Sequence, residues 1–197
     1  MKYRRIWLPV VFLCVATLAG CAHKVPQVKV YPTEGLPFYQ RFPRAFLGAN
    51  QLGDEQIVLI SEGAQTPRSQ GKILYPTNFS SVNQTVVIRV LWKPLAGTRA
   101  DQPTATNATI NWYVRSNMPD EQNDRLDYSG AGFVSVYPTK TGAHVVIRNA
   151  TLALRSESGN MTDPFGKPTI GGSFDVVRND GIVKDIVAQM NTRVASR

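Results

Sequence analysis

Few side chains in this sequence have the types and spacing that catalysis requires. His23 and His144 are the only histidines, and no Gly-x-Ser-x-Gly motif accompanies His144. A Ser-His-Asp hydrolase would have to use His144, which we interpret instead as an ordinary surface histidine at the start of a strand. We expect no catalytic residue, no metal ligand and no bound cofactor, and we favour a non-enzymatic role.

Four carboxylates lie close together between two expected strands, at Asp120, Glu121, Asp124 and Asp127. Oxygen ligands suit Ca²⁺, but this run lacks the Asp-x-Asp-x-Asp-Gly order of a calcium loop and contains Arg125. We therefore interpret the run as a solvated loop. Two of these acids could also serve glycoside hydrolysis. The sequence leaves this alternative open, because that chemistry depends on the distance between the two carboxylates across a cleft.

Aromatic side chains on strands can stack against sugars or cations. Trp92 and Trp112 share the apolar faces of their expected strands, which predicts that both lie in the core. Tyr113 lies on the polar face of its strand with Asn111 and Arg115. Tyr113 and Arg115 are therefore the predicted surface contact for a ligand or partner.

The elements that position these residues are expected to be mainly β-strands. Residues 84–93 and 107–115 alternate between apolar and polar side chains, as strands with one buried face do. Five further strands are expected at residues 56–61, 71–75, 131–137, 143–154 and 172–177. No helical pattern separates these strands, which favours antiparallel pairing. The predicted fold is mainly β: an antiparallel two-sheet β-sandwich.

Helical spacing occurs only near the C-terminus, after Asn179-Asp180-Gly181. The apolar residues at this spacing are Val183, Ile186, Val187, Met190 and Val194. They predict a short amphipathic helix that Asn179 or Asp180 caps and that docks on the sheet of its own chain.

The first residues have the order of a bacterial export signal. Basic residues in the first five positions precede an apolar stretch from Ile6 to about Ala16, and Leu18-Ala19-Gly20-Cys21 follows. This arrangement resembles the lipobox signal peptide of bacterial lipoproteins. The resemblance implies that signal peptidase recognises Leu18, Ala19 and Gly20, cleaves before Cys21, and that Cys21 carries a diacylglyceryl thioether and an acylated amine. It covers about twenty-one residues, and no family resemblance is found for the rest.

Cleavage before Cys21 would leave 177 of the 197 residues, enough for one ordinary domain. Cys14 would leave with the signal and Cys21 would carry the lipid, so no free thiol would remain. The loss of three basic residues lowers the formal net charge from +8 to +5, with no long basic block. This moderate charge argues against nucleic acid as a partner.

The predicted organisation is a signal peptide at 1–20, a lipidated, proline-containing tether at 21–39 and a single β-sandwich domain at 40–197. An extended tether of this length would hold the domain on the order of 50 Å from the bilayer. Four basic residues lie in or near the tether, at Lys24, Lys29, Arg41 and Arg44, and would be attracted to an anionic surface. We nevertheless favour the interpretation of this segment as a solvated linker.

The sequence thus predicts a lipid-anchored protein of the bacterial cell envelope that binds another envelope protein or a glycan. Ala22 rather than Asp follows Cys21, which favours the periplasmic face of the outer membrane in a bacterium that has one. A carboxylate-dependent hydrolase of an envelope polymer and an accessory subunit of an export or surface-organelle machine are the alternatives. Five Asn-x-Ser/Thr triplets also leave a secreted eukaryotic protein open, and the oligomeric state is not predicted.

Overall fold

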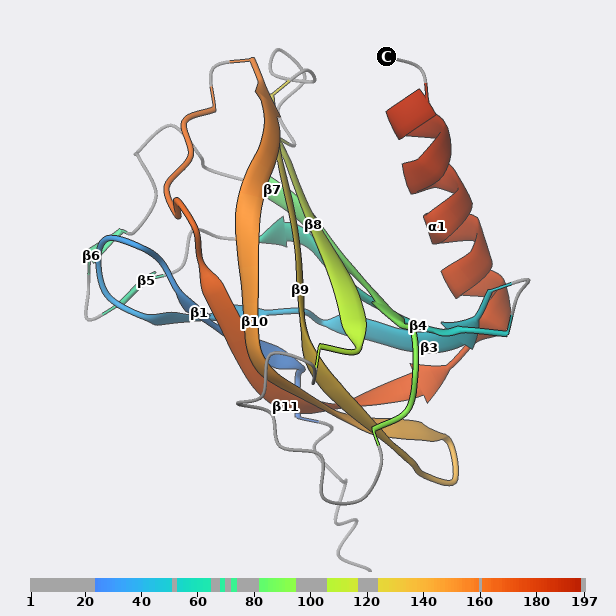
Figure 1. Cartoon of the computed structure of the whole chain (residues 1–197). Coiled ribbons are helices and arrows are strands. Elements are labelled where there is room, and N and C mark those ends of the chain that lie inside the picture. The colour runs from blue at the N-terminus through green and yellow to red at the C-terminus, as the bar shows by residue number, and fades with distance from the viewer. Residues whose placement is uncertain are drawn as a thin grey trace, which may run out of the picture.

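Seven strands form a closed β-barrel, and their side chains divide between an apolar interior and an outer face. The computed structural model describes residues 24–50, 53–64, 68–69, 72–73, 82–94, 106–116, 124–159 and 161–195. The seven strands are β3 (Arg44–Ala49), β4 (Glu55–Ala64), β7 (Val82–Val90), β8 (Ala108–Ser116), β9 (Arg125–Pro138), β10 (Gly142–Ser158) and β11 (Thr169–Arg178). They pair in the order β10-β9-β8-β7-β4-β3-β11, and β11 pairs again with β10, which closes the barrel (Figure 1). Every pairing in this ring is antiparallel except the short parallel pairing of β11 with β3.

A hairpin of β1 (Gln27–Tyr31) and β2 (Phe38–Arg41) extends the sheet beyond the ring, because β1 pairs with the first residues of β11. β5 (Arg68–Ser69) and β6 (Lys72–Ile73) form a separate two-stranded sheet. The single described helix, α1 (Asp180–Ala195), follows β11 directly and packs on the outside of the barrel against β3 and β4 (Figure 1).

The prediction of a two-sheet sandwich is wrong, because the strands form one closed barrel. β9 and β10 run for 14 and 17 residues, longer than the strands expected from the sequence, and their pairing shifts register twice. Such irregularities bend a strand and let one sheet curl until its two edges meet. The alternation of side chains identifies the buried face correctly, but it is the same in a sandwich and in a barrel.

The segment expected to be a tether contributes two strands to the sheet. Val28 and Val30 of β1 are 2% and 0% exposed, and Phe38 of β2 is 4% exposed. These three side chains join the main core, while the residues between them point outward. The described part of residues 21–39 is therefore folded against the barrel, and the folded unit begins before residue 40.

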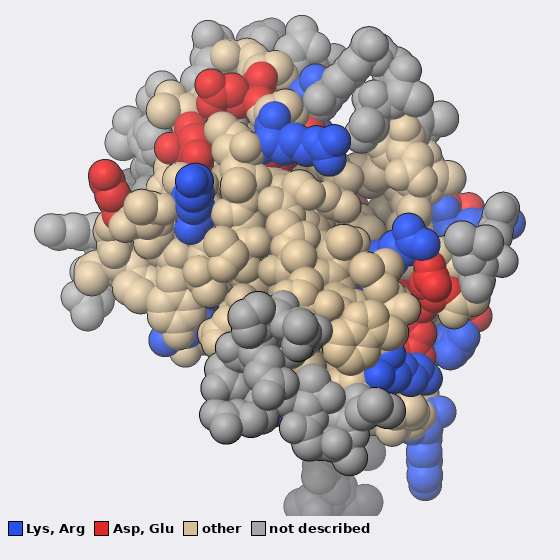
Figure 2. Space-filling view, viewed as in Figure 1, with Lys and Arg blue, Asp and Glu red and all other residues tan. Residues whose placement is uncertain are grey.

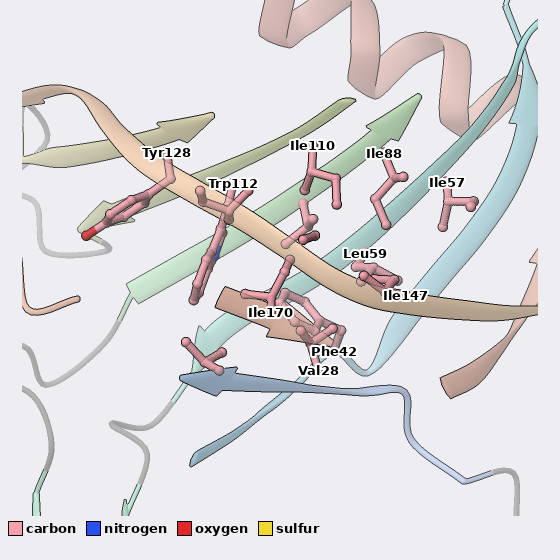
Figure 3. Close-up of a cluster of buried hydrophobic side chains, with 14 of the residues drawn as sticks. Val28, Phe42, Ile57, Leu59, Ile88, Ile110, Trp112, Tyr128, Ile147 and Ile170 are labelled. Atoms are coloured by element: carbon pink, nitrogen blue, oxygen red, sulfur yellow. The ribbon is translucent and has the colours of Figure 1, made fainter. Parts of the chain in front are cut away.

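Apolar side chains pack into the barrel interior from all of its strands (Figure 3). Trp112 is buried as predicted, and Phe165, from the loop between β10 and β11, stacks on it with ring centroids 5.2 Å apart. Trp92, in contrast, is 40% exposed, so its predicted place in the core is wrong. The reason is that β7 ends at Val90, after which the alternation of faces no longer applies.

The predicted C-terminal helix is confirmed, and Asn179 caps it. The Asn179 side-chain oxygen accepts a hydrogen bond from the Ile182 amide at 3.0 Å. Val183 is fully buried in a second apolar cluster with Val58, Ile60 and Val87, so the helix docks on its own barrel as expected. Gly48 of β3 makes this contact close, because a Cβ there would lie 2.8 Å from the Val183 Cβ.

The contact between β3 and α1 predicts that Gly48→Ala is destabilising. The added methyl group would meet the Val183 Cβ at 2.8 Å and the Asp180 Cα at 3.1 Å, which forces the helix away from the sheet. We expect a loss of about 1–3 kcal/mol in the free energy of unfolding, measured by urea denaturation. Gly181→Ala is the matched control, because its Cβ would meet only the Asn179 Oδ1, at 3.6 Å. Equal stability of Gly48→Ala and the wild type would contradict this packing.

Candidate functional site

The candidate site is an open groove of about 390 Å³ on the outer face of the sheet, where the β1–β2 hairpin meets β10 and β11. Its side chains come from three places in the sequence. The hairpin supplies Lys29, Tyr31 and Tyr39, while β10 supplies Arg148 and Asn149. Residues of β11 form the remaining wall, with Gly171 and Gly172 among them.

Strand register brings the three hairpin residues together. Lys29 lies directly opposite Tyr39, and Tyr31 is two residues along the same strand, so the three side chains leave one face. The Lys29 Nζ lies 4.6 Å from the centroid of the Tyr31 ring and 5.8 Å from that of Tyr39. Both tyrosines are exposed, at 41% and 59%. The groove therefore presents a cation between two aromatic rings.

Lys29 stays charged in this setting. A side-chain hydrogen bond with Tyr31 raises the pKa of Lys29 above its ordinary value. Desolvation acts in the opposite direction but is outweighed by this bond and by the electrostatic influence of Tyr31 and Tyr39. An ammonium group held in this way can pair with a carboxylate or phosphate across the whole neutral pH range.

A β-bulge places the residues on the opposite wall. The pairing of β10 with β11 shifts register between Ile147 and Ala150, and Asn149 within this bulge has a φ of 49°. Asparagine tolerates this left-handed conformation better than most residues. Arg148 and Asn149 have no partner in the pairing of β10 with β11, and both side chains are exposed and line the groove.

Two glycines make the hollow. A Cβ at position 172 would approach the Gln27 carbonyl oxygen to 2.8 Å, so this glycine permits β1 to lie close to β11. A Cβ at position 171 would meet only the Ile147 carbonyl oxygen, at 3.4 Å. A larger side chain at position 171 can therefore be accommodated, and it would fill part of the groove.

The predicted surface contact, Tyr113 and Arg115, lies on β8 and does not line the groove. Tyr113 packs against the apolar cluster beneath α1. Arg115 forms an ion pair of 2.5 Å with Asp127, and its guanidinium lies 5.4 Å from the centroid of the Tyr113 ring. The structure brings these two residues together and gives each a partner within the chain, and their role as a surface contact stays a prediction.

The acidic run does not assemble a metal site in the described part of the chain. Asp120 and Glu121 lie outside the described residues, whereas Asp124 and Asp127 are buried at 5% and 6% exposure. The Asp127 carboxylate accepts hydrogen bonds from Arg115 and from the Ser156 hydroxyl. Among the described residues, no three His, Cys, Asp or Glu side chains gather closely enough to hold a metal ion.

His144 is on the surface of β10, as expected, but it has two notable partners on β11. Its Nδ1 lies 2.7 Å from the Asp175 carboxylate, and its Nε2 lies 2.8 Å from the Ser173 hydroxyl. This is the order of contacts in a Ser-His-Asp triad. We call Ser173, His144 and Asp175 together the His144 array. The His144 and Asp175 side chains are 42% and 63% exposed, so the His144 array is open to solvent.

Charges of both signs lie toward the rim of the face that Figure 2 shows, around a centre of uncharged residues. The net positive charge is therefore not gathered into one patch on the described part of this face. Leu18, Ala19, Gly20 and Cys21 lie outside the described residues. Within the described part of the chain, no helix has the length and hydropathy needed to cross a membrane.

The groove was not predicted, because the sequence around three prolines was interpreted as a tether. The signal that could have found it is the alternation of Gln27–Tyr31 and Phe38–Arg41, separated by a turn with Gly35 and Pro37. This pattern is typical of a hairpin with a longer loop. Tyr31, Lys29 and Tyr39 then fall on its polar face.

Comparisons of this chain with protein-family models, with curated proteins and with solved structures found no match. The groove, the His144 array and the N-terminal motif are therefore the observations on which a functional proposal rests.

Proposed function

We propose that this protein is a lipid-anchored module of the bacterial cell envelope that binds an anionic glycan. The observation that carries the proposal is the groove, in which the Lys29 ammonium lies between Tyr31 and Tyr39. Aromatic faces stack on sugar rings, and a fixed cation selects sugars that bear a carboxylate or phosphate. Binding requires no catalytic group.

The barrel interior is filled, so a binding site on the outer surface is favoured. Packed side chains occupy this interior, and Phe165 stacks on Trp112 there. The groove lies outside this core and is open along one side, as a polymer with many units would require. Its volume of about 390 Å³ is in the range of known small-ligand sites.

The opposite wall adds a second charge and an amide. Arg148 can pair with a carboxylate or phosphate through two parallel hydrogen bonds. The Asn149 amide can donate to and accept from sugar hydroxyls. A ligand that spans from Lys29 to Arg148 would thus meet a cation at each side of the hollow.

The groove predicts that acidic oligosaccharides bind more tightly than neutral ones of the same length. Tyr39→Ala should weaken binding about 3- to 10-fold, because one stacking surface is lost. Lys29→Gln should remove most of the preference for the acidic ligand while the barrel stays folded. Isothermal titration calorimetry on the Cys21→Ser form measures both effects.

Trp92→Ala is the matched control for Tyr39→Ala, because Trp92 is 40% exposed and does not line the groove. Gly171→Val gives an independent test, since its side chain would occupy the hollow. Equal binding by wild type, Tyr39→Ala and Gly171→Val would contradict the groove as the site.

The lipid anchor is tested separately through Cys21. We expect wild-type protein from a bacterial host to begin at an acylated Cys21, and Cys21→Ser to accumulate as an uncleaved or soluble form. Mass spectrometry of the mature N-terminus distinguishes these forms. An unmodified wild-type N-terminus would contradict the lipobox and leave ordinary secretion.

One observation favours a second function, hydrolysis of an ester on the bound glycan. Ser173, His144 and Asp175 make the contacts of a catalytic triad, and Ser173 is two residues from Gly171 of the groove on the same face of β11. In this function the Ser173 Oγ attacks the acyl carbonyl while His144 takes its proton. The bond from the acyl carbon to the sugar oxygen then breaks, and His144 gives its proton to that oxygen, which leaves as a hydroxyl. Water, activated by His144, hydrolyses the acyl ester on Ser173 and releases the carboxylic acid.

A fluorophosphonate probe tests this second function, because it labels an activated serine covalently. We expect labelling of the wild type that Ser173→Ala abolishes and that His144→Gln lowers at least 100-fold. Ser156→Ala is the control, since Ser156 donates to Asp127 without a histidine between them. Labelling that is absent, or that is unchanged in Ser173→Ala, assigns the array a structural role only.

A further inference from the structure

We infer that the outer face of the β1–β2 hairpin rests on the anionic surface of the membrane that carries Cys21, so that the groove takes its anionic sugar from that surface. This inference rests on the lipid anchor proposed above and names the source of the groove's ligand.

Only a short length of chain separates Cys21 from the barrel. β1 begins at Gln27, six residues after Cys21. Even fully extended, six residues span only about 20 Å. A lipidated Cys21 therefore holds the start of β1 near the bilayer, far closer than a tether of residues 21–39 would allow.

The side chains of the hairpin alternate between the core and the outer face. Val28, Val30 and Phe38 enter the core, so the alternate residues face outward. On this outer face Gln27 lies opposite Arg41, and Lys29 lies opposite Tyr39. The strand nearest the lipid thus presents basic and aromatic side chains together on one face.

The outer surface of the hairpin segment is rich in exposed apolar and basic side chains. Four of the eight exposed large apolar side chains in the described structure belong to this short segment: Val25, Tyr31, Leu36 and Tyr39. Lys24, Lys29 and Arg41 lie among them, and Glu34 is the only acid between residues 24 and 44. Tyrosine is favoured at membrane interfaces, and basic residues are attracted to anionic lipid.

One basic residue next to the hairpin forms an ion pair and is less available to a membrane. Arg44, the first residue of β3, is paired with Glu62 and so contributes less to attraction. Among the basic residues between 24 and 44, the charge available to the membrane therefore lies on Lys24, Lys29 and Arg41. Figure 1 shows that the barrel lies between β1 and α1, so the helix would face away from the bilayer.

The experiment uses the mature lipidated protein on vesicles. Because neither Cys14 nor Cys21 supplies a free thiol after processing, Leu36→Cys provides a single site for a fluorescent label. Lys184→Cys on the exposed part of α1 provides the matched control. The vesicles contain phosphatidylcholine alone or with phosphatidylglycerol, and a trace of lipid with a nitroxide on its headgroup.

We expect the label at position 36 to be quenched on vesicles with phosphatidylglycerol and the label at position 184 to remain bright. Lys29→Gln combined with Arg41→Gln should lower the ratio of docked to undocked protein on the order of 30-fold. High salt should have a similar effect, since it screens exposed charges. Lys140→Gln is the control for loss of a basic residue elsewhere on the surface.

Equal quenching at positions 36 and 184, or quenching at 36 that does not depend on Lys29 and Arg41, would overturn the inference. The proposed glycan binding is measured on the Cys21→Ser form without vesicles, so it can succeed where docking fails. Conversely, docking without binding of soluble acidic oligosaccharides would support the membrane contact and contradict the glycan as ligand.

Discussion

The barrel depends on β11, which is the strand that closes it. β11 pairs along most of its length with β10, and its other edge is shared between β1 near its start and β3 at its end. The pairing with β3 is parallel and involves only Val177 and Arg178. It is reinforced where the chain leaves the strand, because the Asn179 amide donates to the Leu47 carbonyl oxygen and Asp180 accepts from the Ala49 amide. Asn179 and the first residue of α1 thus stabilise the short pairing of β11 with β3.

This closure also determines where chemistry can occur. Because β1 can pair only with the part of β11 that β3 does not reach, the hairpin lies beside Thr169, Ile170 and Gly171. The bulge of β10 occurs at the same level, since its register with β11 shifts between Ile147 and Ala150. The groove therefore forms where three departures from a regular barrel coincide: an added hairpin, a bulge and adjacent glycines. Its side chains project from a scaffold that packing has already made rigid.

The sequence predicts single elements of this protein better than their assembly. The strands around Val86 and Ile110 and the helix around Val183 follow from periodicity, because each buries one face. Barrel closure does not follow, since it depends on register shifts in the pairing of β9 with β10. The alternation of buried and exposed residues breaks at such a shift, where Arg148 and Asn149 are adjacent and both exposed, but a break of this kind does not show whether a sheet closes. Tyr113 shows a related limit: it lies on the more polar face of β8, but it packs against an apolar cluster to which β4, β7 and α1 contribute, and only the assembled fold reveals this contact. The groove combines residues more than 100 positions apart, Lys29 and Arg148 among them, which no local pattern can connect.

The folded hairpin changes what a lipid on Cys21 would do for binding. An exposed ion pair contributes at most about 1 kcal/mol and a single aromatic contact about 0.5–1.5 kcal/mol, so a groove that offers Lys29, Tyr31 and Tyr39 to its ligand is a weak site in free solution. A weak site suffices when the protein is confined near its ligand, because a short linker gives an effective concentration in the millimolar range. Confinement of this kind favours a shallow, open groove over a deep pocket, since rapid exchange along a surface matters more than a long residence time. The exposed tyrosines, the open groove and the start of β1 at Gln27 all fit a weak site that is held close to its ligand.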